Sequence, residues 1–369
     1  MISSPLPSSL NHKMSVQEVQ ITTPAEDDDF LFAMEIASIS ALPFVTKTII
    51  ELGIIDAVAA SPLSPSEVAS RISSRNPDAP ALLDRMSRLL ASYSILSCSL
   101  HEEDGTFKTL YGLGPKGKFF LRRDTGSVSP LLLYLQHKRV VDGWSHLKDV
   151  ILEGGIPFNR ANGMTLFESH DKDTKFGEVF NSAMRGPTSI IIRKLVDGYP
   201  GFLDINTLVD VGGGVGSTLQ IILEKHPNIK GINYDLPHVI KNAPAHPRIK
   251  HVSGNMFESI PKADAIFMKW IVHAEDDANC AKLMKNCWDA LPEHGKVLIV
   301  DAVVPEQPNS DIVAWNSFLP DMIMLNVAPG KGRDRSMKEF EAIAAQAGFH
   351  PPKVVWRAYN SWVIEFEKM

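Results

Sequence analysis

The sequence contains little cysteine, no long apolar run and no excess of positive charge. Its three cysteines, Cys98, Cys280 and Cys287, are an odd and sparse set among 369 residues. Such a set argues against a disulfide framework and favours a reducing compartment, which predicts a cytoplasmic protein. No apolar segment approaches the ~20 residues that a membrane helix needs. The net charge of −6 disfavours nonspecific binding of nucleic acid, so we expect neither a membrane nor a nucleic-acid partner.

What is present is ordinary globular composition, and the length of 369 residues predicts two domains. Residues 1–28 begin Ser- and Pro-rich and end acidic, and are predicted to form a disordered tail. Residues 29–125 have the pattern of several helices followed by a hairpin around Asp104 and Gly105. That order is typical of a winged helix. Because winged helices serve dimerisation as well as DNA binding, the pattern does not fix a function, and the acidic chain disfavours a DNA-binding regulator.

The second predicted domain, residues 126–369, begins with a mostly helical segment, residues 126–200, that carries scattered Phe and Met. From about residue 205, short apolar runs alternate with helical patterns, from "INTLVDVG" to "SWVIEFE". This alternation predicts an α/β domain, in which helices cover both faces of a mostly parallel sheet.

A glycine-rich turn lies between a predicted strand and a predicted helix in "LVDVGGGVGSTLQIILEKHP". The acid Asp210 precedes the turn, residues 212–216, and Asp235 ends the next strand. Glycines in this place let the backbone approach a ligand closely, and an acid at the next strand end can bind ribose hydroxyls. The pattern therefore predicts a bound adenine nucleoside.

Two cofactors share this part of the fold, NAD and S-adenosylmethionine. The acid Asp210, directly before the glycines, would lie badly against a pyrophosphate but suits the positive amino group of a methionine moiety. S-adenosylmethionine is therefore the predicted cofactor.

Longer stretches resemble the plant small-molecule O-methyltransferases of the caffeic acid type, from about residue 30 to the end: "LVDVGGGVG", "GINYDLPHVI", "HVSGNMFESIPKADAIFMKWIVH", "LMKNCWDALPEHGKVLIVD" and "KEFEAIAAQAGF". The resemblance implies a homodimer with an N-terminal, mainly helical dimerisation domain and a Rossmann-like catalytic domain. It also implies metal-free methyl transfer to a hydroxyl of a small aromatic secondary metabolite, a phenylpropanoid, flavonoid, coumarin or indolic compound. The acceptor pocket is then expected in the segment 126–200.

The same resemblance implies a set of cofactor-binding residues. Gly212 is expected to face the methionine portion and Asp235 to hold the ribose, while Asn255, Met256 and Lys269 surround the adenine. Asn255 departs from the aspartate usual at its place. An amide still accepts and donates hydrogen bonds but carries no charge, so cofactor affinity is expected to be lower.

The motif "KWIVHAEDDANC" places His273 just beyond a predicted strand, at the carboxyl edge where open sheets bind ligands. A neutral imidazole there can remove the proton of a phenol during methyl transfer. The resemblance makes His273 the general base and makes Asp301 and Asp334 the counterparts of two flanking glutamates. A carboxylate on the imidazole would fix its tautomer and favour its charged form. Aspartate keeps that chemistry but is one methylene shorter, so contact with the ring is not assured.

Two other interpretations of this motif stay open. The acids after His273 can simply favour the start of a helix, with the histidine facing solvent. A metal site is the other, but no further residue nearby has ligand spacing, so no metal is predicted.

The resemblance also places an aromatic acceptor between apolar side chains on three segments, as is usual for small-molecule pockets. Leu135 and Ala328, together with Tyr134 and Pro187, occupy places where the caffeic acid enzymes shape or polarise that pocket. Loss of amides there predicts an acceptor less polar than a lignin precursor. The expected wall residues are Phe176, Phe180, Met184, Trp270, Ile323 and Met324.

Two alternative functions remain beside O-methylation. Positioning alone can suffice for a softer nucleophile, so an N- or S-methyltransferase is possible. The substitutions at Asn255, Ala274, Asp301 and Asp334 also allow a catalytically weak chain that forms a heterodimer with an active paralogue.

Overall fold

The structure is a computed structural model that describes residues 25–103, 105–123, 126–328 and 332–368. The chain divides into two compact units, residues 1–43 and 44–369. Most of the predicted tail, residues 1–28, lies outside the described residues, and helix α1 (Ala25–Ser38) includes its end. No single helix in the described part of the chain is long and apolar enough to cross a membrane. One bent pair of helices, Asp27–Ser38 with Ala41–Glu51, meets the length and composition expected of a membrane span.

The helices and hairpin expected in the N-terminal part are present. Ser64 is the N-cap of α4: its hydroxyl accepts from the backbone N–H of Glu67, whose carboxylate accepts from the N–H of Ser64. Glu103 pairs with Thr106, so the hairpin turns at the expected place, although residue 104 itself is not described. The elements are α2 (Ala41–Glu51), α3 (Ile54–Ala60), α4 (Pro65–Arg71), α5 (Ala79–Ser92), β1 (Leu96–Glu103), β2 (Thr106–Leu113) and η1 (Gly117–Phe120).

The segment before the large sheet is helical, as predicted for residues 126–200. Its longest helix, α11, has Pro187 in its interior. The elements are α6 (Ser129–Leu135), α7 (Lys138–Trp144), α8 (Leu147–Glu153), α9 (Pro157–Asn162), α10 (Leu166–Lys172), α11 (Thr174–Gly198) and η2 (Pro200–Phe202).

The large sheet has the strand order β5-β4-β3-β6-β7-β9-β8. The first five strands in this order are parallel, and β9 is antiparallel to both β7 and β8. The mostly parallel sheet is therefore confirmed. The strands are β3 (Thr207–Val211), β4 (Lys230–Asp235), β5 (Ile249–Ser253), β6 (Ala265–Lys269), β7 (Lys296–Asp301), β8 (Lys353–Ala358) and β9 (Ser361–Glu367).

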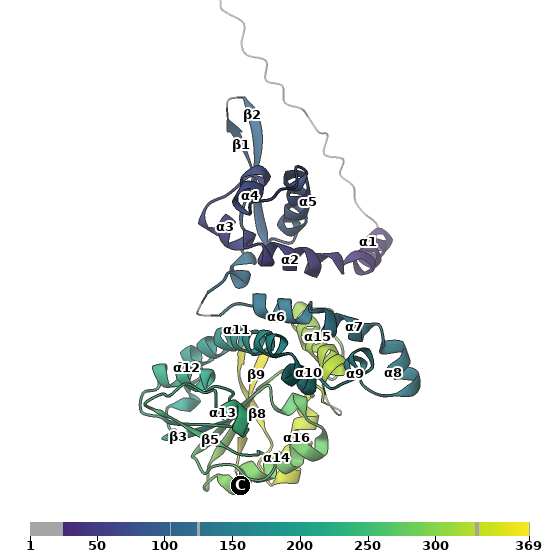
Figure 1. Cartoon of the computed structure of the whole chain (residues 1–369). Coiled ribbons are helices and arrows are strands. Elements are labelled where there is room, and N and C mark those ends of the chain that lie inside the picture. The colour runs from purple at the N-terminus through teal and green to yellow at the C-terminus, as the bar shows by residue number, and fades with distance from the viewer. Residues whose placement is uncertain (1–24, 104, 124–125, 329–331, 369) are drawn as a thin grey trace, which may run out of the picture. The chain divides into compact units, whose positions relative to one another are not determined.

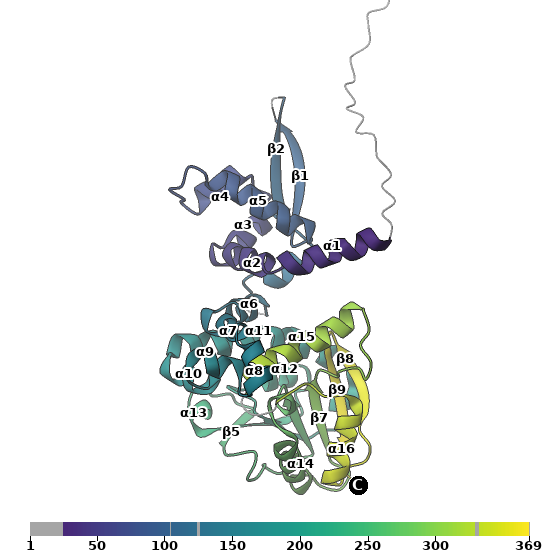
Figure 2. The ribbon, with the colours of Figure 1, turned by 90° about the vertical axis from the view of Figure 1, so that its right-hand side faces the viewer.

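Helices cover both faces of this sheet (Figures 1 and 2). On one face Val209, Ile266 and Ile299 pack into a cluster with α14 and α16, and on the other their neighbours Leu208 and Phe267 pack with α11 and α12. Because alternate residues of a strand point to opposite faces, the strands are buried on both sides. The remaining elements are α12 (Ser217–Lys225), α13 (Pro237–Ile240), η3 (Val272–Ala274), α14 (Asp277–Ala290), α15 (Ile312–Val327) and α16 (Met337–Ala347).

The cysteines follow the sequence-based interpretation. Cys280 and Cys287 are buried on one face of α14, whereas Cys98 is exposed, and all three are free thiols.

The centre of the sheet should be the most sensitive part of the core. Ile266→Ala, at a fully buried position between β3 and β7, should lower the free energy of unfolding by about 2–5 kcal/mol through lost burial and a residual cavity. Urea unfolding measures this. Ile312→Ala, at a position 69% exposed, is the matched control, and equal effects of the two substitutions would contradict this description of the core.

Candidate active site

His273 reaches the carboxyl edge of the sheet through a sharp turn after β6. Strand β6 ends at Lys269, and Trp270 follows with a φ of 56°. A left-handed conformation is uncommon for a bulky side chain and concentrates at functional sites. The one-turn helix η3 then carries His273. The predicted position beyond the strand end is therefore confirmed.

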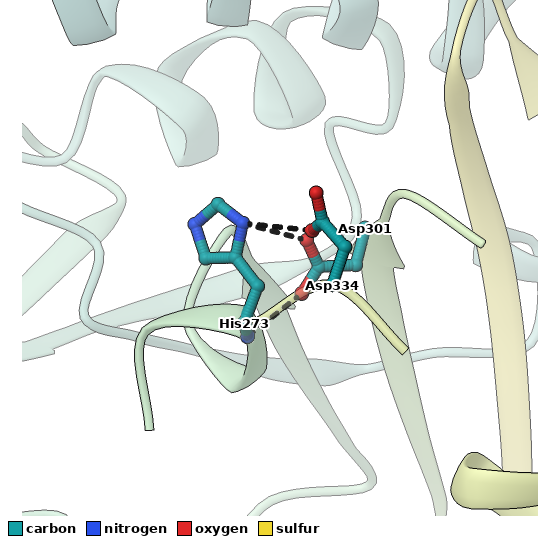
Figure 3. A group of neighbouring side chains, drawn as sticks. All are labelled: His273, Asp301 and Asp334. Atoms are coloured by element: carbon teal, nitrogen blue, oxygen red, sulfur yellow. Dashed lines mark hydrogen bonds and ion pairs between the residues drawn. The ribbon is translucent and has the colours of Figure 1, made fainter. Parts of the chain in front are cut away.

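Asp301 and Asp334 both contact the imidazole of His273 (Figure 3). The Nδ1 atom of His273 lies 3.1 Å from Oδ1 of Asp334 and 3.5 Å from Oδ1 of Asp301. The backbone N–H of His273 also donates to Oδ2 of Asp301 at 3.3 Å. Asp301 ends β7, the parallel neighbour of β6, and Asp334 lies just before α16. The shorter aspartates thus do reach the ring.

The acids that follow His273 in sequence contact groups other than its imidazole. Asp276 caps α14 by accepting from the N–H of Asn279, and the side chain of Asn279 donates to Glu275. Asp277, in the first turn, pairs with Arg335. The helix-start interpretation therefore accounts for these acids, but the carboxylates on the imidazole come from elsewhere in the chain.

The two carboxylates control the charge of the ring. Burial alone would lower the pKa of His273, but the charge of Asp301 and the hydrogen bond to Asp334 raise it above its usual value. Burial also raises the pKa of Asp301 to about 6, and the charge of His273 opposes that rise. When Nδ1 carries a proton and donates to Asp334, Nε2 is the basic nitrogen. In Figure 3 that nitrogen points away from both carboxylates, where it can take a proton from a ligand.

These three side chains also have the composition of a metal site. His273, Asp301 and Asp334 each offer one ligand atom, and these atoms lie within 4.8 Å of one another. Sequence spacing gave no sign of such a group, because the residues come from three distant segments. Hydrogen bonds and ion pairs already join them, so their positions need no metal to be explained, and the prediction of none stays a prediction.

The glycine-rich turn between β3 and α12 has the shape expected of a ligand-binding loop. Gly212, Gly214 and Gly216 all have positive φ, between 60° and 87°. The carboxylate of Asp235 accepts from the N–H of Gly214 at 2.8 Å and from that of Leu236 at 2.7 Å. The structure therefore brings together Gly212 and Asp235, two predicted cofactor-binding residues, at one edge of the sheet.

Two buried polar side chains lie beneath this loop. Asp210 and Asn233 are directly paired on β3 and β4, and a Cβ atom added at Gly213 would lie 2.6 Å from Oδ2 of Asp210 and 2.2 Å from Oδ1 of Asn233. Among the described residues neither of these two oxygens has a hydrogen-bond partner. Burial raises the pKa of Asp210 to about 8. Unpartnered acceptors at this point fit a ligand with a cationic donor, such as the amino group of a methionine moiety. Sequence reasoning missed Asn233, because its place opposite Asp210 depends on the register of β3 against β4.

The other predicted cofactor residues lie at the ends of β5 and β6. The amide of Asn255 is engaged in its own turn, accepting from the N–H of Phe257 and donating to Glu258. Met256 packs against the core. The ammonium of Lys269 lies 2.9 Å from the ring centroid of Trp270. Burial lowers the pKa of Lys269 well below its usual value, while Asp301 and Asp210 oppose this shift.

Five of the six predicted acceptor-wall residues gather in one apolar cluster. Tyr134 belongs to this cluster: its ring stacks on Phe176 at 5.3 Å and its hydroxyl lies 3.4 Å from Nε2 of His170. Trp270 differs, because it packs against the cluster on the α11 and α12 face of the sheet. The five that come together are Phe176, Phe180, Met184, Ile323 and Met324.

Two family models match the chain. Residues 34–123 match the O-methyltransferase dimerisation domain, and residues 144–350 match the O-methyltransferase domain. The second match contains the glycine-rich turn and all three members of the His273 group.

Plant proteins named as O-methyltransferases are similar over nearly the whole chain. Caffeic acid 3-O-methyltransferase 1 of Populus tremuloides is 50% identical, over 96% of this chain and 99% of its own. Esculetin O-methyltransferase of Kitagawia praeruptora is 48% identical, over 93% of this chain and 96% of its own.

Solved structures share the fold at lower identity. Human N-acetylserotonin methyltransferase in complex with SAM has a TM-score of 0.80 and 19% identity, covering 94% of this chain and 99% of that one. LaPhzM has a TM-score of 0.76 and 25% identity, covering 94% of this chain and 100% of that one.

The close approach of the glycine loop to Asp210 and Asn233 yields one prediction. Gly213→Ala should weaken binding of S-adenosylmethionine about tenfold or more, because the added methyl would displace the loop from Asp210 and Asn233. Isothermal titration calorimetry on the whole chain measures this. Gly163→Ala, which has open space around it but strains the backbone at the end of α9 through a φ of 68°, is the control for a general loss of stability. Unchanged affinity in Gly213→Ala would refute the role of this loop.

The carboxylates on His273 yield a second prediction. NMR titration should place the pKa of His273 above 6.5, and Asp334→Asn should lower it, since the charge that stabilises the imidazolium is removed. The signal is assigned by its loss in His273→Gln. Asp276→Asn, which alters the nearby helix cap, should leave the titration in place. A pKa below 6.5 in the unsubstituted chain would contradict the described electrostatics.

Proposed function

Because this chain belongs to the O-methyltransferase family and is an S-adenosylmethionine-dependent enzyme, we propose that His273 removes the proton of the acceptor hydroxyl during methyl transfer. The reaction methylates small aromatic plant metabolites. The observation that carries the proposal is the contact of 3.1 Å between Nδ1 of His273 and Asp334, because it leaves Nε2 as the nitrogen that can accept the proton.

The two aspartates support this role of His273 by balancing the charge that appears on it. When Nε2 takes the phenolic proton, the ring becomes an imidazolium beside Asp301 and Asp334, which are 1% and 0% exposed. Both carboxylates favour that charged form. The raised pKa makes the ring a stronger base, but it also requires a higher pH for the resting ring to be neutral. Activity should therefore fall as the pH drops through the pKa of His273.

The residues at the edge of the sheet fit the cofactor. Its sulfonium supplies the methyl group as an electrophile. We propose that Gly212 and the glycine loop accommodate the methionine portion, with Asp210 available to its amino group, and that Asp235 binds the ribose. Asn255, Met256 and Lys269 then surround the adenine. Since Asp235 already accepts from Gly214, it would hold the loop and the ribose at once.

We propose an acceptor less polar than a lignin precursor: a flavonoid, coumarin, stilbene or indolic compound. Leu135 packs against the apolar cluster, and Ala328 is buried at the end of α15. Neither side chain offers a hydrogen bond. The hydroxyl of Tyr134, a member of this cluster, already contacts His170. Two similar proteins are named for caffeic acid and esculetin, so a phenolic ring is the common element.

The hypothesis of a catalytically weak partner rested on the substitutions at Asn255 and Ala274 and on the two shorter aspartates, Asp301 and Asp334. Since both contact the imidazole, the geometry supports an active enzyme instead. We also propose that the chain forms a homodimer in the cytoplasm. The match to a dimerisation domain over residues 34–123 supports the dimer, as do apolar side chains on α1 such as Phe30 and Ile36, which are 66% and 59% exposed.

Loss of the base tests the mechanism directly. With labelled S-adenosylmethionine and a panel of phenolic, indolic and thiol acceptors, His273→Ala should lower kcat about 10²–10⁴-fold for the best phenol. His101→Ala, which removes an exposed histidine of the hairpin, is the control. If transfer to a phenol survives in His273→Ala, another group or positioning alone carries the reaction.

The same panel tests the acceptor class. A less polar acceptor should have a higher kcat/KM than caffeate and 5-hydroxyferulate, because the pocket side chains Leu135 and Ala328 offer no hydrogen bond. If caffeate or 5-hydroxyferulate gives the highest kcat/KM, the acceptor proposal is wrong while the assignment of the base stands.

A further inference from the structure

The reach of Asp334 to His273 depends on how its backbone is held. The side chain is one methylene shorter than the glutamate that the sequence resemblance implies, yet its Oδ1 lies 3.1 Å from Nδ1 of His273. The backbone itself must therefore lie close to the ring. The chain does approach it there: a Cβ atom added at Gly332 would lie 2.9 Å from the carbonyl oxygen of His273 and 2.7 Å from that of Ala274.

One carboxylate from a different element holds that backbone. The N–H of Asp334 donates to Oδ1 of Asp321 at 2.9 Å. Asp321 is partly buried on α15, thirteen residues earlier in the chain. Two carboxylates in proximity repel each other, and burial together with the charge of Asp334 raises the pKa of Asp321. The hydrogen bond from the N–H of Asp334 opposes this rise in pKa. This bond therefore offsets part of the repulsion between the carboxylates of Asp321 and Asp334.

The next residue fixes the other side of the same junction. Arg335 is 1% exposed, and its guanidinium donates to the carbonyl oxygens of Val272 at 2.6 Å and Glu275 at 2.8 Å. These carbonyls flank His273. Arg335 therefore binds the turn that carries His273, and the N–H of the preceding residue, Asp334, binds Asp321 on α15.

We propose that Asp321 is a positioning residue for methyl transfer, through which α15 sets the place of Asp334 and hence of the imidazole. This inference rests on the proposed role of His273 as base. Helix α15 also carries Ile323 and Met324, two members of the apolar cluster expected to bind the acceptor. One rigid helix then determines both where the acceptor ring lies and how the base is oriented toward it.

The charged groups around this arrangement are few and come from several elements. Asp334, Arg333 and Glu339 act on Asp321. Asp301 from β7 and Lys269 from β6, together with Asp334, act on His273. Asp321 is not among the groups that shift the pKa of His273 directly, so its effect on the base should be transmitted through the position of Asp334.

The test compares two substitutions at the same position. Asp321→Ala removes the acceptor of the Asp334 N–H, whereas Asp321→Asn keeps a carbonyl oxygen in place and removes only the charge. In the full-length enzyme, Asp321→Ala should lower kcat about 10-fold to 100-fold with little change in KM for S-adenosylmethionine. It should also move the acidic limb of the pH profile of kcat/KM to lower pH, since a displaced Asp334 no longer raises the pKa of His273. Asp321→Asn should keep both near those of the unsubstituted enzyme.

Two further variants separate positioning from loss of structure. Asp311→Ala removes the N-cap of α15, which accepts from the N–H groups of Val313 and Ala314, without touching Asp334, and should leave kcat and the pH profile unchanged. Asp334→Glu in the Asp321→Ala background should restore part of kcat, because a longer side chain compensates for a displaced backbone.

The outcomes distinguish the two proposals. If His273→Ala is inactive but Asp321→Ala has unchanged kcat and pH profile, the positioning role is wrong and the base assignment stands. Equal losses in Asp321→Ala and Asp321→Asn would overturn positioning in favour of a charge effect. If His273→Ala remains active, the proposed base fails, whatever Asp321 does.

Discussion

Two buried carboxylates facing one imidazole impose the strongest constraint on this structure. An unpaired buried charge is costly, and two carboxylates side by side repel each other. Asp301 and Asp334 meet that constraint by both contacting Nδ1 of His273. Because the three residues come from the end of β7, the segment before α16 and the turn after β6, the contact ties together three regions far apart in sequence. Hydrogen bonds from Arg335 to the carbonyl oxygen of Val272, and from the N–H of Asp334 to Asp321, add two further contacts at this junction.

Much of the fold was visible in the sequence because its signals are local. Within "ADAIFMKWIV" the stretch "AIFM" is apolar throughout, as expected of a strand buried on both faces, and it lies in β6. Ser64 and Glu67 make the capping box that their spacing indicates. His273 could be placed at the sheet edge because it directly follows a strand.

The partners of His273 could not be read from local pattern. Of the acids that follow it in sequence, Asp276 caps α14 and Asp277 pairs with Arg335. Asp301 and Asp334 were both identified only through the family resemblance. Asp321 and Asn233 were missed, since a backbone contact across a loop and a strand register leave no periodic signal. Trp270 was expected among the acceptor-wall residues but packs elsewhere; it lies in the left-handed turn after β6.

That turn at Trp270 has an energetic consequence. A bulky residue with a φ of 56° carries about 1–3 kcal/mol of conformational strain, which the packing of β6 between β3 and β7 must offset. The strain is borne by the folded chain itself and not introduced when a ligand arrives. The orientation of the imidazole is therefore preorganised. It is set when the chain folds, so the ring does not need to be reoriented in each turnover.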